Sequence, residues 1–146
     1  MLIGLDPLLS PELLSVLRAM GHGDEIAIVD GNYPGAEHAR RLVRADGHDL
    51  PRILDAVLSV LPIDDFVDRA IFRATVKTDL EKRDPVHQDM IDICGRRVPD
   101  QVVEPLAPAD FYNRVQKAYA VIQSSEPRLY GNIILRKGVI RPGATG

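Results

Sequence analysis

The sequence is poor in cysteine and aromatic residues, and it contains no long apolar run. Cys94 is the single cysteine among 146 residues, so neither an internal disulfide nor a cysteine cage for zinc can form. A lone cysteine suits a reducing compartment. No stretch approaches the ~18 uninterrupted apolar residues of a membrane span, and segment 1–14 lacks the basic start of a secretory signal peptide. These absences predict a cytoplasmic protein that does not enter the membrane.

Charge of one sign is not concentrated anywhere along the chain. There are 18 Lys and Arg against 21 Asp and Glu, which gives a net charge of -3. Basic residues cluster only as pairs, at 40–41, 96–97 and 136–137, and such pairs are typical of solvated helix or loop surface. Since binding to nucleic-acid phosphates requires a concentrated basic surface, the sequence predicts no nucleic-acid partner.

Several familiar catalytic motifs are also missing. The chain has no phosphate-binding Walker loop, no GxGxxG, no HExxH and no GxSxG elbow. Its four histidines, His22, His38, His48 and His87, are too scattered to form a metal site at local spacing. The sequence therefore predicts no metal site.

Apolar periodicity and turn residues predict alternating helices and strands. Ser10 and Pro11 begin the first helix as N-cap and first helical residue, and Asp49 with Pro51 begins another in the same way. The apolar run 26–29 is typical of a buried strand. Helices are predicted over 11–20, 36–41, 51–61, 84–95 and 109–123, the last being the longest, and strands over 26–29, 41–44, 70–76, 101–104 and 132–136.

This alternation predicts an α/β fold, a single layered domain with a central, mostly parallel or mixed sheet flanked by helices. Hydrophobic residues make up 45% of the chain, enough to bury a core. No repeat or linker divides the sequence, so we expect one domain over residues 1–140 and a loose tail over 141–146.

His22 is the first candidate for chemistry, because it lies between two glycines at a predicted helix-to-strand junction. Flanking glycines permit a sharp turn that leaves the imidazole accessible. The unperturbed pKa of histidine, about 6.5, suits proton exchange near neutrality. The same pattern is also typical of a hydrogen-bonded turn histidine without catalytic function.

Asp30 is the second candidate, because it follows the buried strand 26–29 at its carboxyl end, where open α/β sheets bind ligands. The third is Tyr130-Gly131-Asn132, whose aromatic face, hydroxyl and amide suit sugar hydroxyls. Each has an ordinary alternative: Asp30 as a turn or helix-cap residue, and Tyr130 to Asn132 as a turn that enters a strand.

Taken together, these segments resemble the RbsD/FucU family. The resemblance runs from about Leu8 to Val139 and is weakest between Ile63 and Pro105. Matches in the same order, which are more specific than any single motif, occur at Met20 to Ile26, Asp30 with Pro34, Arg44-Ala45-Asp46-Gly47, Phe111-Tyr112, Gln116-Lys117-Ala118 and Tyr130 to Ile133.

The motifs Gly-His-Gly-Asp and Tyr-Gly-Asn are closer to the L-fucose mutarotase branch than to the ribose pyranase branch. The resemblance implies an isomerase that interconverts sugar anomers without a cofactor. It implies that His22 is the proton donor, and that Asp30, Tyr130, Gly131 and Asn132 bind the monosaccharide. It also implies a ring-shaped homo-oligomer, commonly a decamer of two stacked pentamers.

The chain departs from the family pattern at two positions. Pro108 stands where a substrate-contacting basic residue is usual, and proline offers no hydrogen-bond donor. Asn32 replaces a histidine that is common in the fucose branch. The identity of the sugar therefore stays open, as do two alternatives: a pyranase that converts pyranose and furanose forms, and a non-catalytic sugar-binding protein of an uptake system.

The predicted strand between His22 and Asp30 sets a geometric condition on the site. An extended segment rises ~3.3 Å per residue, so the two side chains of one chain are expected at opposite ends of the strand. Both could contact one monosaccharide only if the His22 loop folded back along it. The simpler expectation is a site near a subunit interface, shared between neighbouring subunits.

Overall fold

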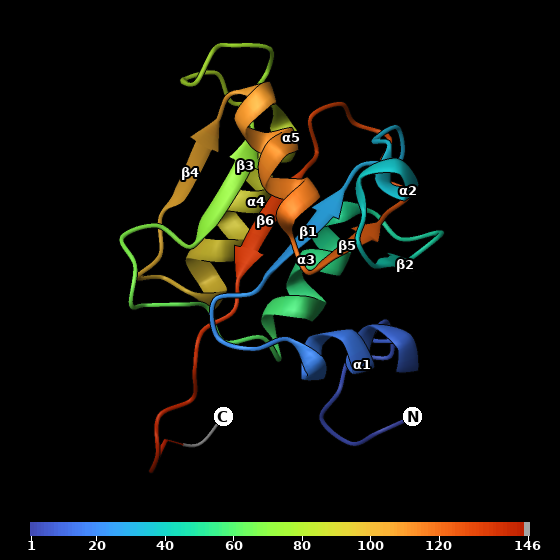
Figure 1. Ribbon diagram of the computed structural model, residues 1–146, viewed down its shortest axis with the longest axis vertical. Coiled ribbons are helices and arrows are strands. Elements are labelled where there is room, and N and C mark those ends of the chain that lie inside the picture. Colours follow the sequence, from blue (N-terminus) through green and yellow to red (C-terminus); the bar gives the residue numbers. More distant parts are fainter. Residues whose placement is uncertain (145–146) are drawn as a thin grey trace.

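The computed structural model describes residues 1–144 and contains six strands. They are β1 Glu25–Val29, β2 Leu42–Arg44, β3 Ile71–Ala74, β4 Val103–Leu106, β5 Ala120–Gln123 and β6 Ile133–Arg136. The strands form one sheet in the order β2-β5-β1-β6-β3-β4 (Figure 1). Five of them run parallel to one another, and β6 runs antiparallel between β1 and β3. The predicted α/β class with a mixed central sheet is confirmed.

Five helices cover both faces of the sheet: α1 Pro11–Ala19, α2 Gly35–His38, α3 Leu50–Leu58, α4 Pro85–Arg97 and α5 Pro108–Lys117. Successive strand residues face opposite sides. Ile26 and Ile28 of β1 pack in one core with apolar residues of α1, α3 and α4, whereas Ala27 and Val29 pack in a second core with Phe111 of α5. The sheet is therefore buried on both faces, which fits its continuous apolar strands.

The helix starts follow the predicted capping residues. Ser10 accepts a hydrogen bond from the Leu13 amide at 3.1 Å, and Asp49 accepts one from the Arg52 amide at 3.0 Å. At α4, Asp84 is the N-cap residue of a reciprocal capping box in which His87 stands where Glu or Gln is usual. Side-chain acceptors thus satisfy amides that would otherwise have no partner.

The predicted helix 109–123 is wrong in its second half. Helix α5 ends at Lys117, and α4, with 13 residues, is longer. Ala118 is extended, and the next residues form β5, which is fully buried between β2 and β1. The error has a physical cause: a strand buried on both faces is apolar at every position, so Ile122 also matched the helical spacing that Phe111 and Val115 began.

The other predicted elements exist, with ends displaced by at most three residues. The four predicted strands other than 26–29 cover 42–44, 71–74, 103–106 and 133–136 in the structure.

Among residues 1–144, no helix is long and apolar enough to span a bilayer. Of the predicted tail, 141–144 contains no helix or strand, and Arg141 pairs with Asp65 at 2.8 Å; residues 145 and 146 lie outside the described part.

The central position of β5 can be tested through Ile122, whose side chain is fully buried. We expect Ile122→Ala to lower the free energy of unfolding by about 2–5 kcal/mol, because the substitution leaves a cavity in the core. Urea denaturation followed by circular dichroism measures the change. The control is Val102→Ala, since Val102 is 52% exposed and its truncation should cost less than about 0.5 kcal/mol. Equal losses in the two variants would contradict the assignment of β5.

Candidate functional site

The carboxyl-terminal edge of the parallel strands carries a polar pocket. Asp30 follows β1, and because β6 is antiparallel, Asn132 precedes β6 at the same edge. The Asp30 amide donates a hydrogen bond to Oδ1 of Asn132 at 2.7 Å. The pocket has a volume of about 190 Å³ and is lined by Asp30, Asn32, Tyr33, Pro34, Tyr112, Leu129, Tyr130 and Asn132.

Asp30 is a buried carboxylate, with 4% of the residue exposed. Burial raises its pKa, although hydrogen bonds from the Asn32 amide, at 2.8 Å, and from Asn132 offset part of this effect. A carboxylate whose pKa is raised is a stronger base than an exposed one. In this pocket it can accept hydrogen bonds from hydroxyl groups or remove a proton from one of them.

Aromatic side chains form the other wall of the pocket. The rings of Tyr33 and Tyr112 lie 5.5 Å apart, and both contact the His38 ring, whose Nδ1 is 2.9 Å from the Tyr33 hydroxyl. Burial raises the pKa of Tyr33, so its hydroxyl stays protonated. The wall thus combines apolar ring faces with hydroxyl groups, which suits a ligand that has both C–H and O–H surface.

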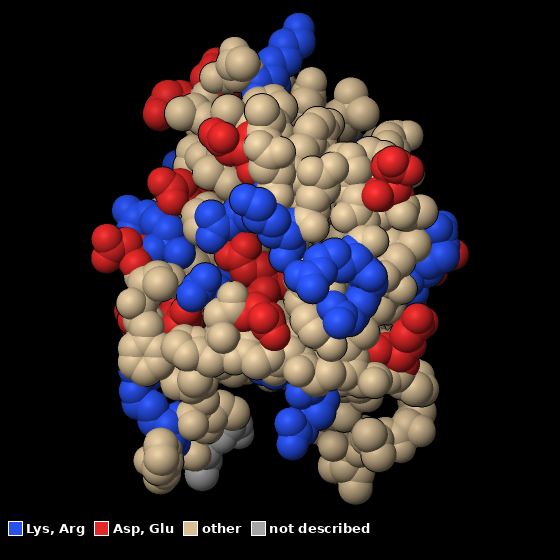
Figure 2. Space-filling model, in the orientation of Figure 1, with Lys and Arg blue, Asp and Glu red and all other residues tan. Residues whose placement is uncertain are grey.

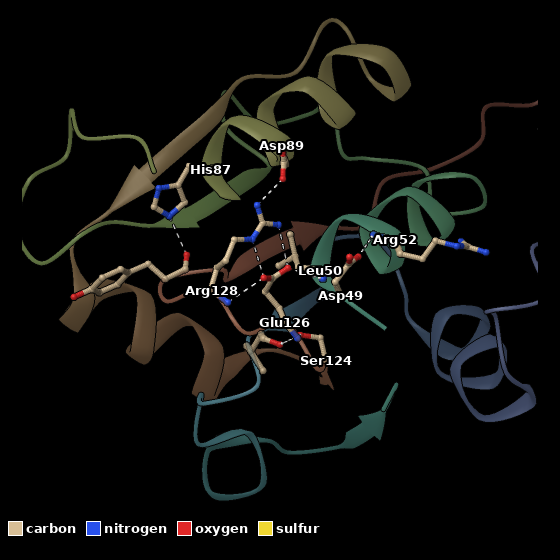
Figure 3. Close-up of polar contacts among 10 residues, drawn as sticks. Asp49, Leu50, Arg52, His87, Asp89, Ser124, Glu126 and Arg128 are labelled. Carbon is tan, nitrogen blue, oxygen red and sulfur yellow. Dashed lines mark hydrogen bonds and ion pairs between the residues drawn. The ribbon is translucent and has the colours of Figure 1, made fainter. Parts of the chain in front are cut away.

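Tyr130 adopts a left-handed conformation, with φ of +62°, which is unfavourable for a residue with a bulky side chain. The fully buried His87 contacts it: Nδ1 accepts a hydrogen bond from the Asp84 amide at 3.1 Å, and Nε2 lies 2.9 Å from the Tyr130 carbonyl. Because Nδ1 accepts a hydrogen bond, Nε2 carries the proton and donates a hydrogen bond to the Tyr130 carbonyl (Figure 3). The imidazole therefore fixes the backbone at the pocket.

Gly131 has no room for a side chain. A Cβ atom there would lie 3.0 Å from Cγ of Glu126 and 3.2 Å from both the Arg128 carbonyl oxygen and Cγ2 of Val86. This close approach explains why glycine stands between the two polar residues of the segment.

Glu126 anchors the loop that leads to this segment. The residue is 1% exposed, and its carboxylate accepts hydrogen bonds from the Leu50 amide and from the amide and guanidinium of Arg128 (Figure 3). Burial acts to raise the pKa of Glu126, but the contacts with Arg128 and Leu50 outweigh it and hold the pKa below its usual value. Arg128 also pairs with Asp89 of α4 at 2.7 Å. The loop is thereby tied to α3 and α4.

His22 lies at the opposite edge of the sheet, before β1. Gly23 takes a φ of +86° and donates its amide to the Lys137 carbonyl at 2.8 Å, so the loop does not fold back toward Asp30. Nε2 of His22 is 3.0 Å from Oδ1 of Asp64, and the ring centroid is 5.0 Å from that of Phe66. The side chain is 41% exposed.

Asp64 is a fully buried carboxylate that orients His22. Burial acts to raise its pKa, but Arg136 at 2.8 Å, the Phe66 amide and His22 outweigh that effect and lower the pKa to about 2. Asp64 therefore stays ionised throughout the neutral range. Because Nε2 of His22 faces this carboxylate, Nδ1 is the ring nitrogen left for other partners, and it has none within residues 1–144.

The structure brings Asp30, Tyr130, Gly131 and Asn132 together and leaves His22 at the other edge. Sequence reasoning did not identify the supporting residues Asp64, His87 and Glu126. Only His87 had a local signal, its position three residues after the N-cap Asp84. Asp64 and Glu126 acquire their roles from partners 42 and 76 residues away in the chain.

The role of His87 can be tested with His87→Phe, which keeps an aromatic ring but neither hydrogen bond. We expect the free energy of unfolding to fall by about 1–3 kcal/mol, because the partly buried Tyr130 carbonyl loses its donor. Burial lowers the pKa of His87 below 6.5. The stabilisation by neutral His87 is therefore present above about pH 6.5, the unfolded value, and is lost as the pH falls through the lower folded pKa.

Denaturation of the wild type, His87→Phe and His48→Phe at pH 7.5 and pH 5 measures both effects. His48 is exposed, so its variant should match the wild type. The wild type should lose more stability on acidification than His87→Phe does. If acidification lowers the free energy of unfolding equally in all three proteins, His87 does not support the loop.

Comparison with known proteins places this geometry in a family. The RbsD / FucU transport protein family matches residues 3–140. The chain is 41% identical to the fucose mutarotase of Homo sapiens over 94% of the chain and 93% of that protein. It is 38% identical, with a TM-score of 0.87, to the fucose mutarotase of Streptococcus pneumoniae, solved in complex with L-fucose, over 96% of the chain and 100% of that structure.

The RbsD protein of Bacillus subtilis, solved in complex with D-ribose, is 20% identical, with a TM-score of 0.72 over 91% of the chain and 95% of that structure, and it shares the fold. The family match extends over nearly the whole chain, and the relatives are covered almost from end to end. The chain belongs to the RbsD/FucU family.

Proposed function

We propose that this chain is a cofactor-independent monosaccharide mutarotase that interconverts the anomers of L-fucose or a related sugar by acid/base ring opening. The observation that carries the proposal is the pocket in which the buried Asp30 carboxylate lies beside Tyr130 and Asn132. The similarity to human and streptococcal fucose mutarotases supports it. We assign the activity to residues 1–140.

Mutarotation requires removal of a proton from the anomeric hydroxyl and delivery of one to the ring oxygen. In our proposal Asp30 accepts the anomeric proton or orients the hydroxyls, a role that its raised pKa supports. Tyr130, Gly131 and Asn132 bind the remaining hydroxyls. When the ring closes on the other face, both proton transfers reverse, so the enzyme is regenerated without a cofactor.

His22 is the proposed proton donor to the ring oxygen. Asp64 fixes its ring through Nε2, so Nδ1 is the atom that would exchange a proton with the sugar. A positioned acid contributes typically ~100- to 10,000-fold to the rate, which is sufficient for a reaction that already proceeds in water.

We propose further that each site is shared between neighbouring chains of a ring-shaped homo-oligomer, a decamer in the cytoplasm. The five residues of β1 lie between His22 and Asp30 of one chain. They span roughly 16 Å at ~3.3 Å per residue. The pocket volume of about 190 Å³ is below the ~300 Å³ at which ligand sites usually begin. The His22 loop of a neighbour would close such a pocket.

A non-catalytic sugar-binding protein is the second candidate, and one observation favours it. None of the described residues that line the pocket is Lys or Arg, and Pro108 takes the first position of α5, where its side chain can donate no hydrogen bond. A site without a cation can still bind sugar hydroxyls through Asp30 and Asn132. A pyranase acting on a different sugar would use the same residues as the mutarotase.

Anomer exchange measured by NMR saturation transfer tests the proposal, with catalytic amounts of protein and L-fucose, D-ribose and related sugars. We expect exchange of L-fucose or a related sugar to accelerate, and His22→Ala to return it toward the spontaneous rate. The control is His48→Ala, since His48 is exposed and belongs to neither edge site.

A sugar-dependent rise in melting temperature without accelerated exchange would instead identify the binding protein. Full activity of His22→Ala would refute the proposed donor. A rate that does not fall as the pH is lowered would count against Asp30 as the base, because protonation of this carboxylate, whose pKa burial raises, should slow the reaction.

A further inference from the structure

A second, basic cavity lies at the edge of the sheet where the parallel strands begin. Its volume is about 400 Å³, and it is lined by Gly23, Asp24, Glu25, Arg40, Arg41, Arg114, Lys117, Tyr119 and Arg136. The cavity thus brings together five cationic side chains that the sequence distributes over three separate segments. Figure 2 shows Lys and Arg gathered near the middle of the face on which α5 lies, around a few acidic side chains.

Positive charge exceeds negative charge in this cavity. Its lining has five cations and two carboxylates, and the buried Asp64 behind Arg136 adds a third negative charge, so positive charges exceed negative ones by two, whereas the whole chain carries -3. Both carboxylates have partners: Glu25 forms a bidentate pair with Arg114, and Asp24 accepts a hydrogen bond from the Gly21 amide. The excess positive charge is therefore not neutralised by the residues of the cavity itself.

Three of the guanidinium groups are held in place by contacts with aromatic rings or a carboxylate of the same chain. Arg41 stacks over the Tyr119 ring, with its guanidinium carbon 3.9 Å from the ring centroid, and Arg114 lies 3.7 Å above Phe72. Arg136 is fixed through Nε by Asp64. Guanidinium groups that are already immobilised lose less conformational entropy when a ligand binds.

Donors remain available after these contacts are counted. Arg136 uses only Nε, and Arg114 uses Nε and Nη2, so the other terminal nitrogens are free among the described residues. Arg40 and Lys117 are exposed and make no side-chain hydrogen bond or ion pair within residues 1–144. Several cationic donors converging on one concavity match the oxygens of a dianion.

We infer that this cavity binds a phosphate monoester of a small polar molecule. Guanidinium groups bind phosphate through paired N–H···O bonds, and a dianion gains more than a carboxylate from a site with excess positive charge. The volume falls within the ~300–1,000 Å³ of small-molecule sites, which leaves room for a group attached to the phosphate. The inference does not depend on the proposed mutarotase activity.

Isothermal titration calorimetry of the full chain tests this inference, with inorganic phosphate and glucose 6-phosphate as probes and chloride at equal ionic strength as the blank. We expect saturable 1:1 binding per chain, tighter for the sugar phosphate. In the double variant Arg40→Gln/Lys117→Gln we expect affinity to fall by roughly tenfold or more, because two charge-assisted hydrogen bonds are lost.

The matched control is Arg69→Gln/Arg96→Gln, which removes the same charge from exposed positions elsewhere and should bind as the wild type does. Heats equal to the chloride blank, or equal loss of affinity in both double variants, would overturn the inference. Sedimentation of each variant provides a second readout. A change of oligomer mass in the Arg40/Lys117 variant, with phosphate affinity unchanged, would make the cavity a subunit interface and also overturn it.

Discussion

The antiparallel course of β6 between two parallel strands is the constraint on which the rest of the molecule depends. A parallel strand there would begin at the edge where β1 begins, and Tyr130 and Asn132 would lie far from Asp30. Because β6 is reversed, its first residues meet the last residues of β1, and Asn132 bonds directly to the Asp30 amide. The same reversal brings Arg136, at the end of β6, to Asp64 beneath His22. One strand thus connects the two edges of the sheet that carry polar side chains.

Hydrogen bonds and ion pairs of buried side chains, more than the sheet itself, hold the polar groups of both edges in place. Glu126, His87 and Asp64 are each almost completely buried, and each satisfies backbone or side-chain partners from other elements. A buried polar group without a partner is costly, so such contacts restrict the loop to one conformation. This explains how Tyr130 is kept at a positive φ beside the pocket that Asp30 lines. Rigid placement of this kind suits acid/base chemistry, in which small displacements of the reacting groups reduce the rate.

Local signals in the sequence were sufficient for most of the fold and for the residues that the structure brings together around Asp30. Ser10, Asp49 and Asp84 mark helix starts because capping is a short-range interaction. Strand β5 was mistaken for helix because burial on both faces removes the alternation that identifies strands. Asp64 and Glu126 could not be recognised because their functions arise from contacts across more than 40 residues. The basic cavity was missed for the same reason, since its cations come from segments far apart in the sequence.

In the proposed shared site, His22 of one chain and the Asp30 pocket of another chain make one active site. Mixed oligomers test it most directly: His22→Ala and Asp30→Asn chains are assembled together in equal amounts, and anomer exchange is compared with that of each variant alone. We expect both pure variants to be inactive and the mixture to recover about one quarter of the wild-type rate, because the two groups of each site are drawn at random from two chains. A mixture that is shown to contain both chains in one oligomer, yet stays at the spontaneous rate, would contradict it.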